Sequence, residues 1–419
     1  MNNFTELPQY RISSKGTKFL RAGHTWVYAD EIIEAPDAEN GSLVSVFSDK
    51  DKFLGTGFLS LNSKIKIRII SDNKNDKFDD AFWKRRFEYA WQYRKAVMRL
   101  EDLNACRIIF GEADSFPGLT VDKFADILVV QILSFGIEKI KENLLTILVK
   151  VLQEDGQKIS GVYERNDSEL RLLEGLEKNC GWLFKPKDVI EETIIEENGI
   201  RYSVDFTKGQ KTGFFLDQKY NRQAVSALAR GKRILDCFTH TGSFALNALA
   251  GGAEFVTAVD ISSRALDSAR KNAALNKKLH TDKKLRFVHA DVFDLLTALV
   301  ENKNGNDWDA VREQSPYGMI ILDPPAFAKQ RGYRDNGLKG YKEINTKAMQ
   351  ILPRGGYLAT ASCSHFISEA DFTEMLFEAA KSVNRKLRII EKRGQAADHP
   401  VLIGIPETWY LKFFLLQVI

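Results

Sequence analysis

A lone thiol and a carboxylate follow two apolar segments that have the length of buried strands. Cys363 follows the segment at 356–362, and Asp323 follows Met-Ile-Ile-Leu at 319–322. Ligands of an open α/β sheet bind outside the carboxyl ends of its strands, so both side chains are expected to face one crevice. A thiol beside a carboxylate in such a crevice indicates covalent chemistry on a base.

Three further strand-like segments end in an aspartate: Asp236, Asp260 and Asp291. Asp260 lies 24 residues after Asp236, about the separation at which an acid reaches the ribose hydroxyls of a nucleotide in a βαβ unit. A lone aspartate at a strand end is more often a turn or helix-capping residue. Three in succession at these spacings favour a nucleoside site.

The loop after the first of these strands favours a ligand without phosphates. Residues 236–244 contain one glycine, Gly242, rather than the Gly-x-Gly-x-x-Gly pattern that cradles a pyrophosphate. S-adenosylmethionine fits, because its ribose offers two hydroxyls to Asp260, its adenine amine can donate to Asp291, and its sulfonium tolerates carboxylates. The residues predicted to bind it here are Asp236, Thr239, Gly242, Asp260, Ile261, Asp291, Val292 and Asp323.

Composition permits an anionic partner without requiring one. The chain has 419 residues, enough for two or three domains, and a net charge of +4. Its four cysteines are scattered, with no Cys-x-x-Cys pair and no histidine spacing suited to zinc, which predicts a reduced cytoplasmic protein without a structural metal. Neither an export signal nor a segment near the ~20 apolar residues of a membrane-spanning helix is apparent.

The strand and helix patterns divide the chain into three predicted domains. Residues 1–72 alternate β-rich runs with glycine turns, which predicts a small β-barrel-like domain. Residues 73–195 read as a mixed α+β middle domain. In residues 196–419 strands alternate with helices, which predicts a parallel sheet, closed by an antiparallel pair near 387–390 and 409–414. The expected fold class is α/β, with a Rossmann-like domain last.

Several separate motifs resemble, in the right order, the RlmI-type family of bacterial ribosomal RNA large-subunit methyltransferases. The match covers nearly the whole chain. The motifs are Gly-His-Thr-Trp-Val-Tyr at 23–28, Tyr-Glu-Arg-Asn-Asp at 163–167, Gly-Gln-Lys-Thr-Gly-Phe-Phe-Leu-Asp-Gln at 209–218 with Asn221 and Arg222, Thr-Gly-Ser-Phe at 241–244, Asp-Pro-Pro-Ala-Phe at 323–327, Ser-Cys-Ser at 362–364 and Gln-Ala-Ala-Asp-His-Pro at 395–400.

The resemblance implies a PUA-like RNA-binding domain at 1–72 and a class I S-adenosylmethionine-dependent methyltransferase domain at 196–419. The implied product is 5-methylcytidine in 23S ribosomal RNA, and the segment around Phe215 and Asp217 is implied to close over the cofactor. The expected partner is that ribosomal RNA, with a homodimer as a further option and with no metal or membrane.

The implied reaction assigns roles to Cys363 and Asp323. Cytosine C5 is a poor nucleophile until a thiolate adds at C6, so Cys363 is the predicted nucleophile, and Asp323 is the predicted partner of N3. A nearby positive charge is expected to favour the thiolate. Better-known RNA cytosine-C5 methyltransferases carry a second cysteine where Ala326 stands here, so no residue is assigned as the base that releases the adduct.

Two alternatives remain open. The segment at 323–327 also resembles the loop of RNA methyltransferases that act on exocyclic amines or on guanine N7, so guanine N2 or N7 is the alternative target. There the acid and a backbone carbonyl hold an amine and Phe327 stacks on a flipped base, with no need for Cys363. The second alternative is a non-catalytic RNA-binding assembly factor, against which the intact aspartate set argues.

The predicted RNA contacts centre on a segment rich in cations and glycines at 329–340. Cations neutralise phosphate and glycines let a loop close on a substrate, although a solvated surface loop is the simpler interpretation. The predicted RNA-binding residues are Phe327, Lys329, Arg331, Arg334 and Arg165.

Overall fold

The computed structural model of the chain describes residues 7–303, 305–328 and 330–419. The chain divides into two compact units, and each is assembled from segments that are separated in the sequence. Unit 1 comprises Met1–Ile195, Val204–Leu216 and Ala397–Thr408; unit 2 comprises Glu196–Ser203, Asp217–Ala396 and Trp409–Ile419. The division into three domains at 72 and 195 stays a prediction.

The first sheet of unit 1 confirms the β-rich amino-terminal domain. Its elements are β1 (Gln9–Ile12), α1 (Ser14–Arg21), β2 (Trp26–Tyr28), β3 (Ile32–Glu34), β4 (Leu43–Ser48), β5 (Phe53–Leu59) and β6 (Ile65–Ser71). The strand order is β2-β6-β5-β4-β1-β3, in which only the β1–β4 pair is parallel among the described residues. Alternate apolar residues such as Ile12, Val27, Val44 and Ile67 fill its interior.

The second sheet of unit 1 packs against two long helices. Its elements are α2 (Asp80–Val97), β7 (Ala105–Phe110), β8 (Leu119–Phe124), β9 (Ile127–Ile132), α3 (Phe135–Glu154), β10 (Gly161–Asn166), α4 (Leu170–Leu173) and β11 (Asn179–Phe184). The strand order is β11-β10-β9-β8-β7. Large side chains of α2 at helical spacing, among them Trp83, Phe87 and Trp91, share a core with Leu144 and Leu148 of α3.

A late segment of the chain completes unit 1. Residues Ala397–Thr408 belong to it, and there the Asp398 carboxylate accepts a hydrogen bond from the backbone N–H of Arg107 at 2.8 Å. The wholly buried guanidinium of Arg94 donates to the carbonyl of Asp398 at 2.8 Å and forms a bidentate pair with Asp114. These partners satisfy polar groups that the sheet alone would leave buried and unpaired.

Unit 2 is built on a seven-stranded sheet. Its strands are β14 (Arg233–Cys237), β15 (Phe255–Asp260), β16 (Leu285–His289), β17 (Met319–Leu322), β18 (Tyr357–Ser362), β19 (Leu387–Arg393) and β20 (Lys412–Val418). The order is β16-β15-β14-β17-β18-β20-β19, with the first five strands parallel and β20 antiparallel to both neighbours. The predicted parallel sheet with its antiparallel closing pair is therefore confirmed. A separate two-stranded sheet pairs β12 (Glu192–Glu197) with β13 (Ile200–Asp205).

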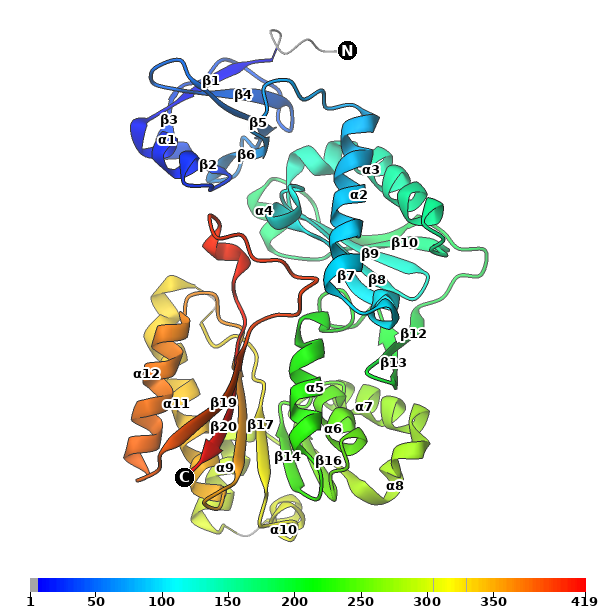
Figure 1. Cartoon of the computed structure of the whole chain (residues 1–419), viewed down its shortest axis with the longest axis vertical. Coiled ribbons are helices and arrows are strands. Elements are labelled where there is room, and N and C mark those ends of the chain that lie inside the picture. Colours follow the sequence, from blue (N-terminus) through cyan, green and yellow to red (C-terminus); the bar gives the residue numbers. More distant parts are fainter. Residues whose placement is uncertain (1–6, 304, 329) are drawn as a thin grey trace. The chain divides into compact units, whose positions relative to one another are not determined.

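Helices cover both faces of the seven-stranded sheet, as a doubly wound fold requires. They are α5 (Lys219–Leu228), α6 (Ser243–Ala250), α7 (Ser263–Leu275), α8 (Thr281–Lys284), α9 (Val292–Glu301), α10 (Asn306–Arg312), α11 (Arg334–Ile351) and α12 (Glu369–Ser382). Figure 1 shows α11 and α12 on one side and α5 and α6 on the other, and each set closes its own apolar core. None of the described helices is both long and apolar enough to cross a membrane.

A buried ion pair fastens α5 within unit 2. Arg222 donates through Nε and Nη2 to the two carboxylate oxygens of Glu197 at 2.7 and 2.8 Å, and both side chains are at most 1% exposed. A bidentate pair of this geometry compensates for the desolvation of its charges only while both partners are present.

We expect Arg222→Met to destabilise unit 2 by about 3–5 kcal/mol, because it strands the Glu197 carboxylate in a buried site. The double variant Arg222→Met/Glu197→Met should recover most of that loss, since no unpaired charge remains. Calorimetric unfolding measures both effects. Arg233→Met is the matched control: it breaks the exposed pair with Glu254 and should cost less than about 1 kcal/mol. Equal losses in all three variants would contradict the assignment.

Candidate functional site

The predicted chemical groups meet where the strand order of unit 2 reverses. The chain runs outward from β14 through β15 to β16, and then returns to the other side of β14 as β17. Cys237 pairs with Leu322, and Leu322 pairs with Thr360. The residues after β14, β17 and β18 therefore leave the sheet at one edge, the position at which α/β proteins bind ligands. We call Asp236, Asp260, Asp323 and Cys363 the strand-end site.

The loop after β14 adopts a backbone conformation that few side chains favour. Phe238, His240 and Gly242 have φ of 62°, 50° and 76°. The loop is held by hydrogen bonds from the Thr239 N–H to the Val259 carbonyl and from the His240 N–H to the Asp260 carboxylate, both 2.9 Å. Left-handed backbone at non-glycine residues is concentrated at functional sites. Of these three residues the sequence analysis used only Gly242; His240 is of a type enriched at positive φ, whereas the residue type of Phe238 gives no such signal.

Asp236 is a wholly buried carboxylate. One of its oxygens accepts a hydrogen bond from the Thr239 hydroxyl at 2.6 Å. Burial raises the pKa of Asp236 to about 7 against the lowering effect of that hydrogen bond, and the negative charges of Asp323 and Asp260 add to the rise. Three carboxylates thus act on one another at the strand ends. A positively charged ligand relieves their repulsion, so these residues fit the sulfonium of S-adenosylmethionine.

Asp260 and Asp291 are both engaged by backbone groups. The two oxygens of Asp260 accept from the N–H groups of His240 and Ser262, at 2.9 and 2.8 Å. Asp291 caps α9 by accepting from the Phe293 N–H at 2.7 Å. Carboxylate oxygens have further lone pairs, so neither arrangement prevents a ligand contact. The proposed contacts to ribose and adenine stay predictions.

The smaller predicted cofactor contacts differ in exposure. Ile261, which follows β15, is 63% exposed, whereas Val292 in the first turn of α9 is 2% exposed. Asp217 accepts a hydrogen bond from the Tyr410 hydroxyl at 2.6 Å, and its backbone carbonyl accepts from the Ala396 N–H at 2.8 Å. Phe215 belongs to unit 1, so only Asp217 of that pair is described together with the strand-end site.

A chain of amide groups orients Asp323. The Gln218 side chain donates through Nε2 to Asp323 Oδ1 at 2.8 Å, and its own Oε1 accepts from Asn221 Nδ2 at 2.6 Å. Asn221 Nδ2 also donates to the Gly394 carbonyl at 3.1 Å. Asn221 therefore fixes which end of the Gln218 amide faces Asp323. The motif at 209–218 contained Gln218, but no sequence signal connects it with a carboxylate 105 residues away.

Cys363 lies beside the loop that follows β17. Its Sγ is 3.9 Å from the Pro324 carbonyl oxygen, and the residue is half-buried. Cys237, by contrast, is completely buried in the core, and burial raises the pKa of its thiol well above the usual value. Of these two thiols, only the one at the end of β18 is accessible for chemistry.

Phe327 contributes to the core under the strand-end site. Its ring packs 4.6 Å from Tyr341, 5.7 Å from Phe293 and 6.5 Å from Phe238 by ring centroids. The ring is nevertheless half-buried rather than fully enclosed. Its contact with a base stays a prediction.

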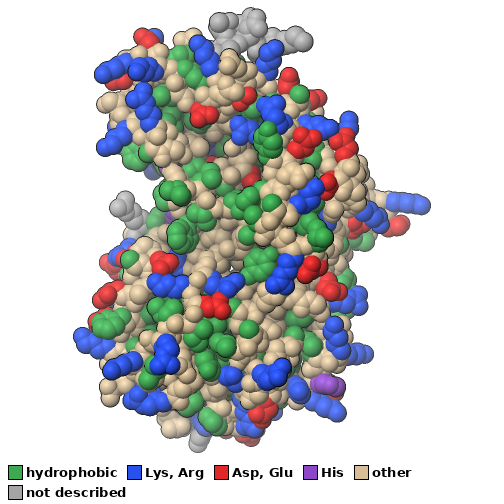
Figure 2. Space-filling view, in the orientation of Figure 1, with side chains coloured by type: hydrophobic (Ala, Val, Ile, Leu, Met, Phe, Trp, Pro, Cys, Tyr) green, Lys and Arg blue, Asp and Glu red, His purple; other side chains and the backbone are tan. Residues whose placement is uncertain are grey.

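The predicted cationic RNA contacts are divided between the two units. Arg334 donates to Asp335 at 3.0 Å and to Asp371 at 2.5 Å. Arg165 lies in unit 1, is 4% exposed, and donates to the carbonyls of Phe206 and Gly209. Lys329 and the side chain of Arg331 lie outside the described residues. Lysine and arginine side chains alternate with acidic ones on the face shown in Figure 2.

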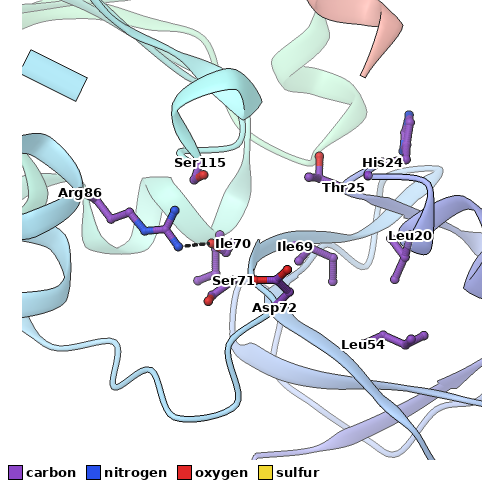
Figure 3. Close-up of a pocket in the computed structure, with 11 residues that line it drawn as sticks. Leu20, His24, Thr25, Leu54, Ile69, Ile70, Ser71, Asp72, Arg86 and Ser115 are labelled. Carbon is purple, nitrogen blue, oxygen red and sulfur yellow. Dashed lines mark hydrogen bonds between the residues drawn. The ribbon is translucent and has the colours of Figure 1, made fainter. Parts of the chain in front are cut away.

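A pocket of about 210 Å³ lies in unit 1, and none of the residues that line it is a predicted site residue. Its lining includes His24, Ile69 and Asp72, and the Arg86 guanidinium donates to the Ile70 carbonyl at 3.1 Å (Figure 3). Residues that line it are mainly apolar or neutral, and they offer neither a nucleophile nor a carboxylate cluster. Within the described part of the chain, no group of three or more His, Cys, Asp or Glu side chains is placed to hold a metal ion.

Comparison with known proteins gives matches along nearly the whole chain. Residues 11–72 match a family model described as a PUA-like domain, and residues 170–404 match one described as S-adenosylmethionine-dependent methyltransferase. Proteins named ribosomal RNA large subunit methyltransferase I are similar over 403 residues: the Aliivibrio fischeri protein is 37% identical and that of Photobacterium profundum 39%, each match covering 96% of this chain and 97% of the relative.

Solved structures share the fold. A crystal structure of a candidate methyltransferase complexed with SAH aligns with a TM-score of 0.80 at 24% identity, covering 98% of this chain and 99% of that one. A candidate methyltransferase from Streptococcus mutans aligns with a TM-score of 0.79 at 24% identity, with the same coverage. At this identity the likeness establishes the architecture, which confirms the predicted fold class.

The buried Asp236 makes stability depend on pH. Its carboxyl ionises near pH 4 in the unfolded chain and near pH 7 in the fold, so the ligand-free protein loses stability as pH rises through that window, by up to about 4 kcal/mol. We expect the melting temperature of Asp236→Asn, relative to wild type, to rise between pH 5 and pH 8. Asp267→Asn, at an exposed carboxylate on α7, is the control. Parallel pH profiles for wild type and Asp236→Asn would refute the assignment.

Proposed function

This chain belongs to the ribosomal RNA large subunit methyltransferase I family, and on that premise we propose that it forms 5-methylcytidine in 23S ribosomal RNA through a covalent adduct with Cys363. Family membership makes the chain a methyltransferase that uses S-adenosylmethionine, as the aspartates at the strand ends predicted. The ribosomal RNA substrate, cytosine as the base, C5 as the target atom and a cytoplasmic location are parts of the proposal.

The position of Cys363 carries this proposal. Its half-buried thiol lies 3.9 Å from the carbonyl of Pro324, the residue that follows Asp323. A nucleophile and a carboxylate that leave adjacent parallel strands at one edge can engage the same pyrimidine ring. Methylation of an exocyclic amine or of guanine N7 requires no thiol there.

The residues perform the proposed reaction as follows. The Cys363 thiolate forms a bond to cytosine C6, and the electron pair of the C5–C6 double bond makes C5 nucleophilic. S-adenosylmethionine supplies a methyl group on a positively charged sulfur, which leaves as a neutral thioether. Asp323 gives its proton to N3 as the thiolate adds, and it then accepts hydrogen bonds from N3–H and from the N4 amine while C5 takes that methyl. Loss of the C5 proton to a base then restores the double bond and releases the Cys363 thiolate.

The hydrogen bond from Gln218 favours cytosine over uracil. The amide N–H that points at Asp323 Oδ1 stabilises the carboxylate that remains after its proton passes to N3. Cytosine protonated at N3 presents two donors to that carboxylate, N3–H and the N4 amine, whereas uracil presents N3–H beside a carbonyl oxygen that the carboxylate repels. The same acceptor would suit the amines of guanine and adenine, so the thiol rather than the acid distinguishes C5 methylation from the alternative.

The RNA contacts of the proposal combine both units. The PUA-like domain would hold RNA, and Phe327 and Arg334 stand at the substrate side of the strand-end site. Arg334 is 41% exposed even while it pairs with Asp371, so a phosphate can exchange with one of its partners. The packing of Phe327 on three aromatic rings supports a role as a wall of the base pocket rather than as a mobile stacking group.

We expect Cys363→Ala to abolish formation of 5-methylcytidine, because no other group at the strand-end site can add to C6. The measurement incubates protein with undermodified ribosomal RNA and labelled S-adenosylmethionine, and identifies the nucleoside by mass spectrometry. RNA that carries 5-fluorocytidine should also trap wild type, but not Cys363→Ala, as a covalent complex, since fluorine cannot leave as a proton does.

Cys180→Ala is the matched control, because Cys180 is an exposed thiol of unit 1, and its activity should equal that of wild type. A methylated guanosine whose yield is the same in Cys363→Ala would overturn the proposal and establish the alternative. Absence of any methylated product with every RNA, despite binding, would favour the assembly factor.

Loss of the amide that orients Asp323 should slow methyl transfer without weakening cofactor binding. A hydrogen bond to a charged group contributes about 1.5–3 kcal/mol, so Gln218→Met should lower the single-turnover rate about 10- to 100-fold. Calorimetric titration should find the affinity for S-adenosylmethionine within about threefold of wild type. Gln350→Met, at an exposed position on α11 of the same unit, is the control, and an unchanged rate in Gln218→Met would rule out the orienting role.

A further inference from the structure

A buried lysine stands on the strand next to Cys363. Lys412 begins β20 and is 4% exposed. In the antiparallel pairing of β18 with β20 it lies opposite Ser362, the residue before Cys363. Lysine is rarely buried to this degree without a carboxylate partner, because its charge must be desolvated.

The hydrogen bonds of Lys412 hold its ammonium at the end of β18. Nζ donates to the Ser364 carbonyl at 2.6 Å and to the Tyr410 carbonyl at 2.9 Å. Ser364 follows Cys363 directly, so the ammonium is hydrogen-bonded to the backbone one residue beyond the thiol. Among the described residues, Lys412 forms no ion pair, and an ammonium has three N–H donors of which these carbonyls use two.

Two acids, Cys363 and Asp371, act on the charge of Lys412. Burial lowers the pKa of Lys412 to about 8, and the negative forms of Cys363 and Asp371 oppose that change. The interaction is mutual: a thiolate at Cys363 raises the pKa of Lys412, and the ammonium of Lys412 lowers the pKa of the Cys363 thiol by the same interaction. Asp371 on α12 is paired with Arg334 at 2.5 Å. Of the two acids, Cys363 is therefore the one next to the hydrogen-bonded Ser364, and Lys412 can assist its ionisation.

Three other groups near Cys363 among the described residues do not supply a buried positive charge. Tyr341 on α11 is neutral over the working range, because burial raises its pKa to about 12. Asp323 after β17 is an acid and disfavours a neighbouring thiolate. His365, two residues beyond Cys363, is exposed and packs edge-on against Phe366. Of these four groups, Lys412 is the buried cation.

We propose that Lys412 is a positioning residue that holds Cys363 as the thiolate required for addition to the base. The proposal deepens the proposed function and rests on Cys363 as its nucleophile. It also supplies the positive charge that a cysteine nucleophile at this position needs. The lysine acts through the thiol and is not required to touch the substrate.

The test measures the reactivity of Cys363 directly. Full-length protein is treated with iodoacetamide between pH 5.5 and 10, and alkylation of each cysteine is followed by peptide mass spectrometry. Lys412→Met keeps the apolar length of the side chain and removes the charge. Its pH midpoint for alkylation of Cys363 should rise by about 1 unit or more, so that the rate at pH 7 falls about tenfold. Lys412→Arg should retain a low midpoint.

Lys392→Met is the matched control, because this exposed lysine on β19 pairs with Glu369 and should leave the Cys363 midpoint unchanged. An unchanged midpoint in folded Lys412→Met overturns the proposal. If Lys412→Met does not fold, the wild-type protein provides the test. A pH midpoint for alkylation of Cys363 below that of free cysteine supports the role of Lys412. A midpoint at or above that of free cysteine overturns it.

The readouts separate this inference from the proposed function. If 5-methylcytidine forms but the midpoint of Cys363 does not move in Lys412→Met, the role of Lys412 fails and the covalent mechanism stands. If the midpoint moves but wild type makes no 5-methylcytidine, the electrostatic role stands and the proposed reaction fails.

Discussion

The parallel pairing of β14 with β17 and of β17 with β18 is the constraint on which the strand-end site depends. It brings Cys237 level with Leu322 and Leu322 level with Thr360, so the residues that follow emerge together. Because side chains alternate between the faces of a sheet, a slip of one residue would turn the Asp236 side chain to the opposite face. The apolar side chains that fix this register, such as Ile320 and Ile321, therefore also fix the chemistry.

The site is electrically divided. Carboxylates crowd the ends of β14, β15 and β17, and burial together with mutual repulsion makes Asp236 reluctant to ionise. The opposite holds at β18, where the charged group tied to the strand end is the ammonium of Lys412. In the proposed reaction a cationic methyl donor belongs at the acidic side and an anionic nucleophile at the basic side. Burial of the charged forms of Asp236 and Lys412 lowers the stability of the ligand-free protein. A ligand or an intermediate of opposite charge is therefore bound favourably at each position.

Groups that are encoded locally could be predicted from the sequence. Strand-ending aspartates, the single glycine of the β14 loop and the alternation of strands and helices each reflect short-range preferences. The fold class predicted from them and from the family motifs was confirmed by the observed sheets and by the matching family models. Contacts between distant segments could not be predicted. Gln218 meets Asp323 across 105 residues and Lys412 meets Ser364 across 48, and neither residue type marks such a partner. Arg165 shows the converse: it was predicted to bind RNA, yet its buried guanidinium donates to backbone carbonyls inside unit 1.

The segment Ala397–Thr408 of unit 1 has a consequence for folding during synthesis. The N–H of Arg107 finds its acceptor in Asp398, 291 residues further along the chain. At about 5–20 residues per second, roughly 15–60 s pass between the synthesis of Arg107 and that of Asp398. During this interval Arg94 also lacks the carbonyl that Asp398 provides. Unit 1 therefore cannot make these two contacts until nearly the whole chain has been synthesised.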